Sequence, residues 1–302
     1  MTSQAVRVGA RRGGYTAYLI PGLVAFAVVV LVPTVANTWL SLTRWSGIGE
    51  PVFIGMENYS QLFSDAMFWR SFSNSVAVIL AMAVVPTTLG LVLAAVLHDY
   101  VAPRFGGVTS AAMRALIYIP QIIPIAVAGV LWNFILQPQT GLLNNALRRL
   151  GLAGLASNWL GDPALALPTL MVILVWLQLG YTLVVFMSGL SRVDPSLHEA
   201  ASLDGAGWWR RFLDVTVVAL RPEIAVVLLT TTVAGLKVFA PIFVLTSGGP
   251  GDATTVPSYF AFYHFFTTMK VGYGAAVANT LAVILTVLAV TLLAVQTRRS
   301  QV

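Results

Sequence analysis

One segment sets the architecture of this chain, and it reads Asp194-Pro195-Ser196-Leu197-His198-Glu199-Ala200-Ala201-Ser202-Leu203-Asp204-Gly205-Ala206-Gly207-Trp208-Trp209-Arg210-Arg211. It is the longest charged stretch in a mostly apolar sequence. Asp194 is a favourable N-cap, Pro195 suits the first helical position, and Gly205 can end the helix in a left-handed conformation. A second short helix is expected from Trp208 to about Leu213. Because apolar runs flank this helix–glycine–helix segment, we expect it to project from a membrane as a foot (residues 194–211).

The composition predicts an all-α, polytopic membrane protein. Of the 302 residues, 58% are hydrophobic and 9% are charged, whereas a soluble domain carries roughly 25% charged residues. Apolar runs long enough to cross a bilayer predict six transmembrane helices, at residues 15–42, 71–98, 115–136, 164–190, 223–245 and 272–296. The first run is long and lacks a small-residue cleavage site, so we expect no cleavable signal peptide.

The distribution of basic residues predicts the orientation. Six spans place both termini on the same side as the foot. Eleven of the 17 Lys and Arg residues fall on that side and five on the other, which indicates that the foot is cytoplasmic. We therefore expect residues 1–14 to form a cytoplasmic N-terminal tail and residues 15–302 to form one transmembrane domain, with both termini in the cytoplasm of a bacterial cell.

Enzymatic and nucleic-acid functions find no support in the sequence. The basic residues lie at span ends and form no dense run between aromatic residues, so we expect no nucleic-acid partner. The chain has no cysteine, no G-x-x-x-x-G-K-[ST] phosphate loop, no H-E-x-x-H motif and no G-x-S-x-G motif. His98, His198 and His264 lie far apart in the sequence and in the predicted topology. We therefore expect neither a metal site nor a cofactor, and ATP hydrolysis on a different subunit.

The foot resembles the EAA loop of permease subunits from ATP-driven, binding-protein-dependent (ABC) importers. That pattern reads Glu-Ala-Ala, three residues, Gly, nine residues, then an Ile-x-Leu-Pro-like segment. Glu199-Ala200-Ala201 and Gly205 match it, and Asp204-Gly205-Ala206 is also typical of the family. Val218 stands at the proline position, which is a departure. Arg221-Pro222 lies just beyond and can supply the turn into the next span.

Three further segments resemble the carbohydrate branch of this family, the maltose and glycerol-phosphate permease type. Residues 55–59 (Gly-Met-Glu-Asn-Tyr) are similar to its short extracytoplasmic segment before the second span. Residues 119–124 are similar to its third-span entry, and residues 245–250 (Leu-Thr-Ser-Gly-Gly-Pro) to its Leu-Thr-x-Gly-Gly-Pro loop. The resemblance covers nearly the whole chain and implies the type I ABC importer permease fold.

The resemblance also implies partners and a mechanism. A coupling loop at about residues 191–221 would contact a nucleotide-binding subunit and move as a rigid body when its ATP-bound dimer closes. The residues implied in this contact are Glu199, Ala200, Ala201, Asp204 and Gly205. The full importer would contain a second homologous permease, two ATP-binding subunits and an extracytoplasmic substrate-binding protein, all in or at a lipid membrane. A mono-, di- or oligosaccharide would cross by alternating access.

Polar residues inside the apolar runs are the candidate substrate contacts, because lipid-facing polar groups are costly. Gln121 lies between Pro120 and Pro124, and Gln178 and Tyr181 share a helix face because they are three residues apart. The resemblance implies sugar contacts at Gln121, Ile125, Gln178, Tyr181 and the segment 234–238. Lys237 is the only basic residue well inside a predicted span. It can face the cavity, contact a partner subunit or snorkel to the interface, and Tyr181 can instead pack between spans.

Three alternatives stay open at this point. A glycerol-phosphate importer should place several arginines in its cavity, and only Lys237 is available. An ion-coupled secondary transporter should carry carboxylates within the membrane, whereas Asp99 and Glu223 lie at span edges. A structural or assembly subunit of the membrane would need neither a foot nor cavity-facing polar groups.

Overall fold

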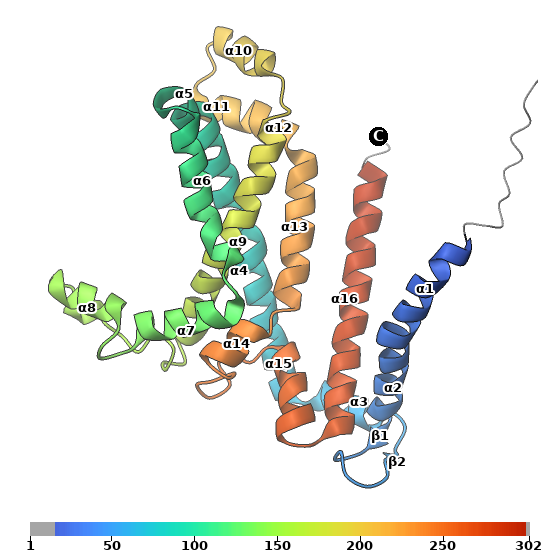
Figure 1. Cartoon of the computed structure of the whole chain (residues 1–302). Helices are drawn as coiled ribbons and strands as arrows, with labels where there is room; N and C mark the ends of the chain where they lie inside the picture. Colours follow the sequence, from blue (N-terminus) through green and yellow to red (C-terminus); the bar gives the residue numbers. More distant parts are fainter. Residues whose placement is uncertain (1–15, 300–302) are drawn as a thin grey trace, which may run out of the picture.

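The computed structural model describes residues 16–299 as an assembly of helices (Figure 1). The expected N-terminal tail, residues 1–14 with Arg7, Arg11 and Arg12, lies outside the described residues. Within the described range the strands are β1 (Thr43–Arg44) and β2 (Val52–Phe53), which pair antiparallel with Arg44 opposite Val52. The predicted all-α class is confirmed.

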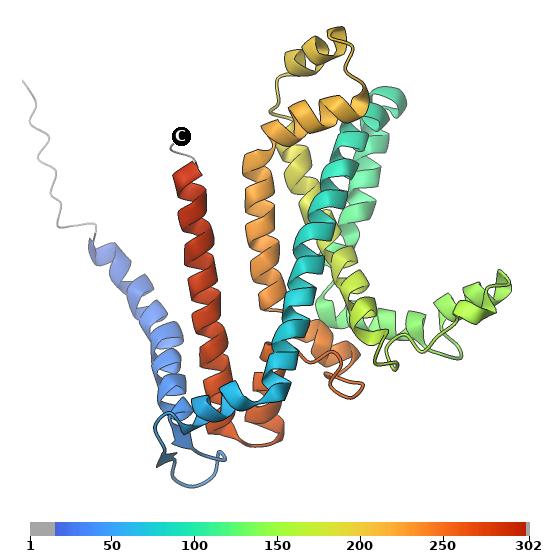
Figure 2. The same cartoon turned by 180° about the vertical axis from the view of Figure 1, so that it is seen from behind.

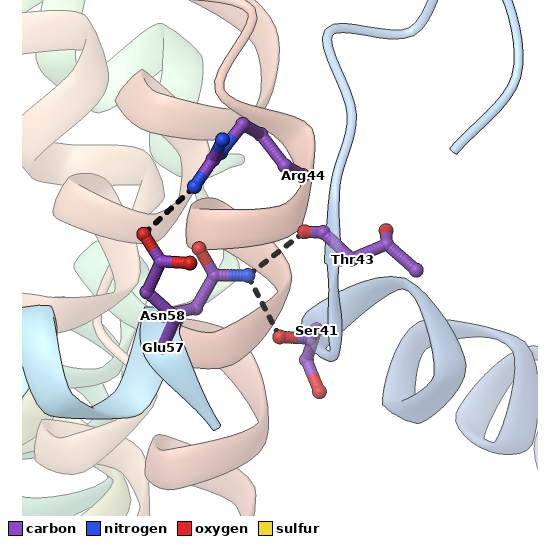
Figure 3. A network of polar contacts seen from close by, with 5 residues as sticks. All are labelled: Ser41, Thr43, Arg44, Glu57 and Asn58. Atoms are coloured by element: carbon purple, nitrogen blue, oxygen red, sulfur yellow. Dashed lines mark hydrogen bonds and ion pairs between the residues drawn. The ribbon is translucent and has the colours of Figure 1, made fainter. Parts of the chain in front are cut away.

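The first span is one interrupted helix made of α1 (Thr16–Phe26), a π-helical turn (Ala27–Leu31) and α2 (Val32–Ser41). The wide turn comes just before Pro33, which has no N–H for the helical ladder. A small polar network closes the end of this span (Figure 3). Asn58 of α3 (Glu57–Ser64) donates to the carbonyl oxygens of Ser41 and Thr43, at 2.8 and 2.9 Å, and Arg44 pairs with Glu57 at 2.7 Å.

Four helices form the central bundle: α4 (Ala66–Val96), α6 (Gly107–Ile122), α9 (Ala166–Leu190) and α13 (Arg221–Leu236). Helix α4 continues through a π-helical turn (Leu97–Val101) into α5 (Ala102–Phe105). Glycines allow α9 to approach its neighbours closely: a Cβ on Gly90 of α4 would lie 2.2 Å from Thr182 Oγ1, and one on Gly180 would lie 2.8 Å from the Tyr118 backbone of α6. Small residues at crossings are typical of membrane bundles, and here they place α9 at the centre.

The last span, α16 (Val271–Arg299), pairs with the first. Asn37 Nδ2 donates to Asn279 Oδ1 at 2.7 Å, and Asn279 Nδ2 donates to Ser41 Oγ at 3.2 Å. In both views α16 and the α1–α2 helix meet at the end opposite the foot and diverge toward the other end (Figures 1 and 2). Helix α15 (Pro257–Phe262) and a π-helical turn (Tyr263–Thr267) lead into α16.

The predicted spans are not all straight helices. In the described range, four helices are long and apolar enough to cross a membrane: Tyr18–Ser41, Ala66–Phe105, Ala166–Leu190 and Val271–Thr291. The pair of α6 and α7 (Ile125–Leu136) meets the same length and hydropathy test only when the two helices are taken together, and the pair is bent by 99°. The predicted run 115–136 is therefore wrong as one straight span, since its helix begins at Gly107 and breaks at Pro124. Proline disfavours the helical conformation of the preceding residue, and Ile123 is extended (φ −67°, ψ 126°).

The predicted run 223–245 is likewise divided. Helix α13 has 16 residues and ends at Leu236, and α14 (Ala240–Leu245) follows after a short break. Pro241 lies in the first turn of α14, where its missing N–H leaves no bond unmade. At the other end of α13, Pro222 lies in the first turn, so Arg221-Pro222 does begin this helix, as the sequence suggests.

The two ends of the bundle carry different elements. The foot contains α10 (Pro195–Leu203) and α11 (Trp208–Arg211), followed by a π-helical turn (Phe212–Thr216) and α12 (Val217–Ala219). At the opposite end lie α7, α14, the β1–β2 hairpin and a lateral arm with α8 (Leu142–Arg149) and a 3₁₀ turn (Ala153–Leu155) (Figures 1 and 2). We call this the distal end.

Candidate functional site

The first helix of the foot begins and ends as the sequence predicts. Asp194 Oδ1 accepts a hydrogen bond from the Ser196 N–H at 2.9 Å, and this contact lowers the pKa of Asp194 from its ordinary value. Pro195 opens the helix, and Gly205 follows it with φ +75°. The second helix is longer than expected. From Trp208 it continues through a π-helical turn (Phe212–Thr216) and α12 to Ala219, so the expected end at about Leu213 is wrong.

The five residues implied in coupling line one short, accessible segment. Glu199, Ala200, Asp204 and Gly205 are exposed, and Ala201 is half-buried. The apolar side chain of Leu203 is 89% exposed and that of Leu197 is 51% exposed. Exposed apolar side chains beside acidic ones on the same short helix are typical of a surface that binds a partner protein.

The base of the foot is tied to the end of the second span. Trp208 Nε1 donates to Asp99 Oδ2 at 3.0 Å, and Asp99 Oδ1 bonds to His98 Nδ1 at 2.9 Å. The Trp208 ring stacks on Phe212, with centroids 5.3 Å apart, and meets Tyr100 at 5.9 Å. The second helix of the foot is thus fixed to the α4 extension by a charge-assisted hydrogen bond and an aromatic cluster.

Sequence reasoning missed this contact. It treated Asp99 only as an acid at a span edge. An available signal was the indole N–H of Trp208, which needs an acceptor when buried, together with an acid predicted at the same membrane face. His198 also lies within electrostatic range of Asp99, so His98 and His198 approach one carboxylate despite their sequence separation. Among residues 16–299, no three His, Cys, Asp or Glu side chains group as metal ligands.

A second tie closes the foot where it leaves and rejoins the bundle. Arg192, just after α9, forms an ion pair with Glu223 in the first turn of α13. Gly189 makes room for this contact, since a Cβ there would lie 2.5 Å from Leu220 Cδ2 and 3.0 Å from Glu223 Cγ. The chain segments on either side of the foot are therefore held together by this ion pair. Displacement of the foot would move the ends of α9 and α13 with it.

Three of the five predicted substrate contacts lie at helix breaks. Gln121 is in the last turn of α6 and Ile125 is the first residue of α7, on either side of the break at Pro124. Lys237 is the C-cap of α13, at the break before α14. Gln121 and Lys237 are exposed and Ile125 is half-buried. Helix breaks leave backbone groups free to bind a ligand, which is typical of transporter binding sites.

The other two candidates lie in the middle of α9. Gln178 and Tyr181 are both half-buried. The Tyr181 hydroxyl bonds to Thr230 Oγ1 of α13 at 3.0 Å, so it links two helices in this conformation. The Gln178 amide has no hydrogen-bond partner among the described residues. Of the pair, Gln178 is the one with free hydrogen-bonding groups.

Two short helices cover the distal end. A Cβ on Gly129 of α7 would lie 2.6 Å from Val244 Cγ1 of α14, so the two helices touch where the glycine leaves space. Nearby, Trp132 meets Trp176 of α9 edge to face, with centroids 5.4 Å apart. Both helices begin at the breaks that hold Gln121, Ile125 and Lys237, so their movement would change access to these residues.

Gly205, in the turn between the two helices of the foot (the elbow), allows a direct test of the geometry of the foot. The EAA-loop resemblance predicts that an ATPase subunit binds the foot. Gly205→Val should weaken this predicted attachment, because a left-handed conformation costs a β-branched residue roughly 1–2 kcal/mol. No other atom lies within 4 Å of the added Cβ, so the effect comes from the backbone alone. Gly207→Val is the matched control, since Gly207 has an ordinary φ of −65° and equally open surroundings. Co-purification of the ATPase measures the effect, and equal yields for the two variants would contradict a strained elbow.

Comparison with known proteins agrees with this geometry. A family model described as the binding-protein-dependent transport system inner membrane component matches residues 100–300. The chain is 35% identical over 268 residues to the probable ABC transporter permease protein YurN of Bacillus subtilis (strain 168), covering 88% of this chain and 90% of that protein. It is 33% identical over 261 residues to the trehalose/maltose transport system permease protein MalF of Thermococcus litoralis, covering 86% and 85%.

A solved structure shares the fold. The chain superposes on a bacterial ABC transporter involved in the import of the acidic polysaccharide alginate, with a TM-score of 0.79 and 22% sequence identity. The match covers 94% of this chain and 95% of that one. The predicted type I importer permease fold is confirmed by this likeness.

Proposed function

This chain belongs to the inner membrane components of binding-protein-dependent transport systems, and we propose that it is the permease subunit of an ATP-driven carbohydrate importer. The observation that carries the proposal is the foot. It offers an exposed helix to a partner and is tied at its base to α4, α9 and α13. A transport subunit driven from outside needs such a lever, whereas an ion-coupled transporter does not.

A saccharide substrate is supported by the relatives. The Thermococcus litoralis protein is named for trehalose and maltose, and the structural neighbour for alginate. The candidate contacts at the helix breaks and on α9 are Gln121, Ile125, Gln178, Tyr181 and Lys237. Amide groups form hydrogen bonds with sugar hydroxyls, and aromatic rings stack on sugar C–H faces. The single lysine is compatible with a neutral sugar and with a carboxylated one.

The proposed assembly has separate parts for recognition, passage and energy. An extracytoplasmic substrate-binding protein delivers the sugar at the distal end, and a second homologous permease completes the passage. Two ATP-binding subunits hydrolyse ATP and move the feet of both permeases. Residues 191–221 act as the coupling loop of a single permease domain, residues 15–302.

We further propose that the foot and both chain termini face the cytoplasm. The excess of basic residues on that side supports this orientation. Six crossings result when the bent pair α6–α7 and the broken pair α13–α14 each count as one. Alternating access then amounts to rigid movement of the foot at one end and of α7 and α14 at the other.

Reconstitution tests this function. The purified permease pair, ATPase and cognate binding protein in proteoliposomes should take up a sugar ligand of that binding protein only when ATP is present. In the same assay Gln178→Ala should lower uptake by up to roughly tenfold, because one or two neutral hydrogen bonds are lost. Stimulated ATPase activity should remain.

The controls separate energy source from substrate contact. A proton or sodium gradient without ATP should drive no uptake. Uptake that follows the ion gradient would contradict the proposed function. Normal uptake by Gln178→Ala would contradict only the cavity assignment on α9.

A further inference from the structure

An apolar groove opens at the distal end between α7, α8 and α9. Its volume is about 500 Å³, and its walls include Trp132, Leu142, Ala146, Trp159 and Val172. We call it the α8 groove. Leu142 is 70% exposed and Val172 is 63% exposed. Helix α8 projects sideways from the bundle in both views (Figures 1 and 2). Its residues Leu142, Leu143 and Ala146 form one wall of the groove.

The groove is built by specific hydrogen bonds. Asn144 is buried in α8, and its Nδ2 donates to the carbonyl oxygens of Pro138 and Ser157, at 3.0 and 2.8 Å. Its Oδ1 accepts from Trp159 Nε1 at 2.8 Å. One amide therefore joins α8 to the segments before and after it and holds the Trp159 ring in the groove wall. The apolar walls are positioned before any ligand arrives.

Two neighbouring arginines of α8 have different surroundings. Arg148 donates to the carbonyl oxygens of Pro138 and Gln139, at 2.8 and 2.9 Å, and so holds α8 against the preceding turn. Arg149 is exposed, and its guanidinium makes no hydrogen bond or ion pair with any described residue. Leu142, Ala146 and Arg149 follow the i, i+4, i+7 pattern, so they share one face of the helix. Arg149 thus lies about 4.5 Å along the axis beyond Ala146, just past the groove wall on the same face of α8.

The depth of the groove matches the level of lipid headgroups. Its α9 residues, Thr169, Val172 and Ile173, lie roughly 5–10 Å from the start of that membrane-spanning helix. Tryptophans such as Trp132 and Trp159 are typical of this interfacial level, and a guanidinium binds a phosphate through two parallel hydrogen bonds. An apolar groove with an unpaired cation just past its wall fits a molecule with an anionic head and a hydrocarbon tail.

We propose that the α8 groove binds an anionic phospholipid from the membrane leaflet at the distal end. One acyl chain lies along Trp132, Ala146 and Trp159, and the phosphate pairs with Arg149. Because the groove also borders α7, bound lipid would brace the helix that covers the distal end of the passage. The site is separate from the candidate sugar contacts at the helix breaks.

Native mass spectrometry of the intact importer, released from nanodiscs that contain phosphatidylglycerol and phosphatidylcholine, tests this site. Arg149→Gln should lower retained phosphatidylglycerol by about fivefold, which corresponds to the loss of about 1 kcal/mol for one arginine near anionic lipid. Ala146→Trp should remove the retained lipid by filling the groove. Ala146 is exposed, so this change leaves the helix core intact. Arg70→Gln, at an exposed arginine of the same end, should retain lipid as the wild type does.

Two results would overturn the proposal. One is equal retention of phosphatidylglycerol by the wild type, Arg149→Gln and Ala146→Trp. The other is a photo-crosslinker at Leu142 that joins the partner permease and not lipid, since the groove would then be a subunit contact. Lipid retention is measured without transport, so these results do not depend on whether the importer carries a sugar.

Discussion

Trp208→Ala is expected to lower ATP-driven uptake by roughly ten- to a hundredfold, because it removes the side-chain contacts between the foot and the end of the second span. The indole donates to Asp99 at 3.0 Å and stacks on Phe212. A hydrogen bond to a charged group is worth about 1.5–3 kcal/mol, and its loss also leaves the Asp99 carboxylate with one partner fewer. Movement of the foot would then no longer reach α4.

The neighbouring tryptophan is a matched control. Trp209 is 62% exposed, and its indole N–H makes no hydrogen bond with a described residue. Trp209→Ala should keep uptake within about twofold of the wild type, because it removes edge-to-face contacts with Trp208 and Phe212 but leaves the hydrogen bond from Trp208 to Asp99 in place. Uptake and ATPase activity should be measured on the same proteoliposomes. If the foot is uncoupled from the spans, ATP hydrolysis continues while uptake falls. Equal loss in the two variants would show that Trp208 matters only as part of an aromatic surface.

Gly90→Leu is expected to prevent assembly of the central bundle. A Cβ at Gly90 would lie 2.2 Å from Thr182 Oγ1 and 2.9 Å from Thr182 Cβ, and Thr182 itself donates to the Pro86 carbonyl at 2.9 Å. The larger side chain must separate α4 from α9 and break that bond. Overpacking of this kind costs about 1–3 kcal/mol, and the lost hydrogen bond adds about 1 kcal/mol.

Thermal stability of the purified permease pair measures this effect, together with the fraction that stays monodisperse in detergent. Gly22→Leu is the control, since no other atom lies within 4 Å of a Cβ at that position in α1. It makes the same change in an apolar helix without a close neighbour. If Gly90→Leu is as stable as Gly22→Leu, the α4–α9 crossing is looser than the structure describes.

Much of the architecture could be predicted without coordinates, because it depends on neighbours in the chain. The low charge and long apolar runs identify a membrane protein in any fold. Asp194, Pro195 and Gly205 act through caps and backbone conformation within a few residues, so the first helix of the foot follows from local rules. The spacing from Glu199 to Gly205 also lies within this segment, which is why the family resemblance was visible.

The prolines of the third span show that local sequence alone does not predict where a helix breaks. Pro120 and Pro124 are four residues apart, yet Pro120 is buried inside α6 while Pro124 breaks the chain into two helices bent by 99°. Helices in lipid tolerate a proline when neighbouring groups satisfy the freed carbonyls, and those neighbours come from elsewhere in the chain. The breaks in the third and fifth predicted spans, and the positions of Gln121, Ile125 and Lys237 at these breaks, therefore required the structure.

Contacts between distant segments were also beyond the sequence. Asp99 and Trp208 are 109 residues apart. The sequence offers an indole donor and an acid at the same membrane face, but only the packing of the helices pairs these two residues. Arg148 and Arg149 are adjacent and chemically identical, yet only Arg148 is held by backbone carbonyls. A pattern along the chain reports which residues share a helix face. Which helices pack together, and so which polar groups are left free for a ligand, depends on burial and hydrogen bonding in three dimensions.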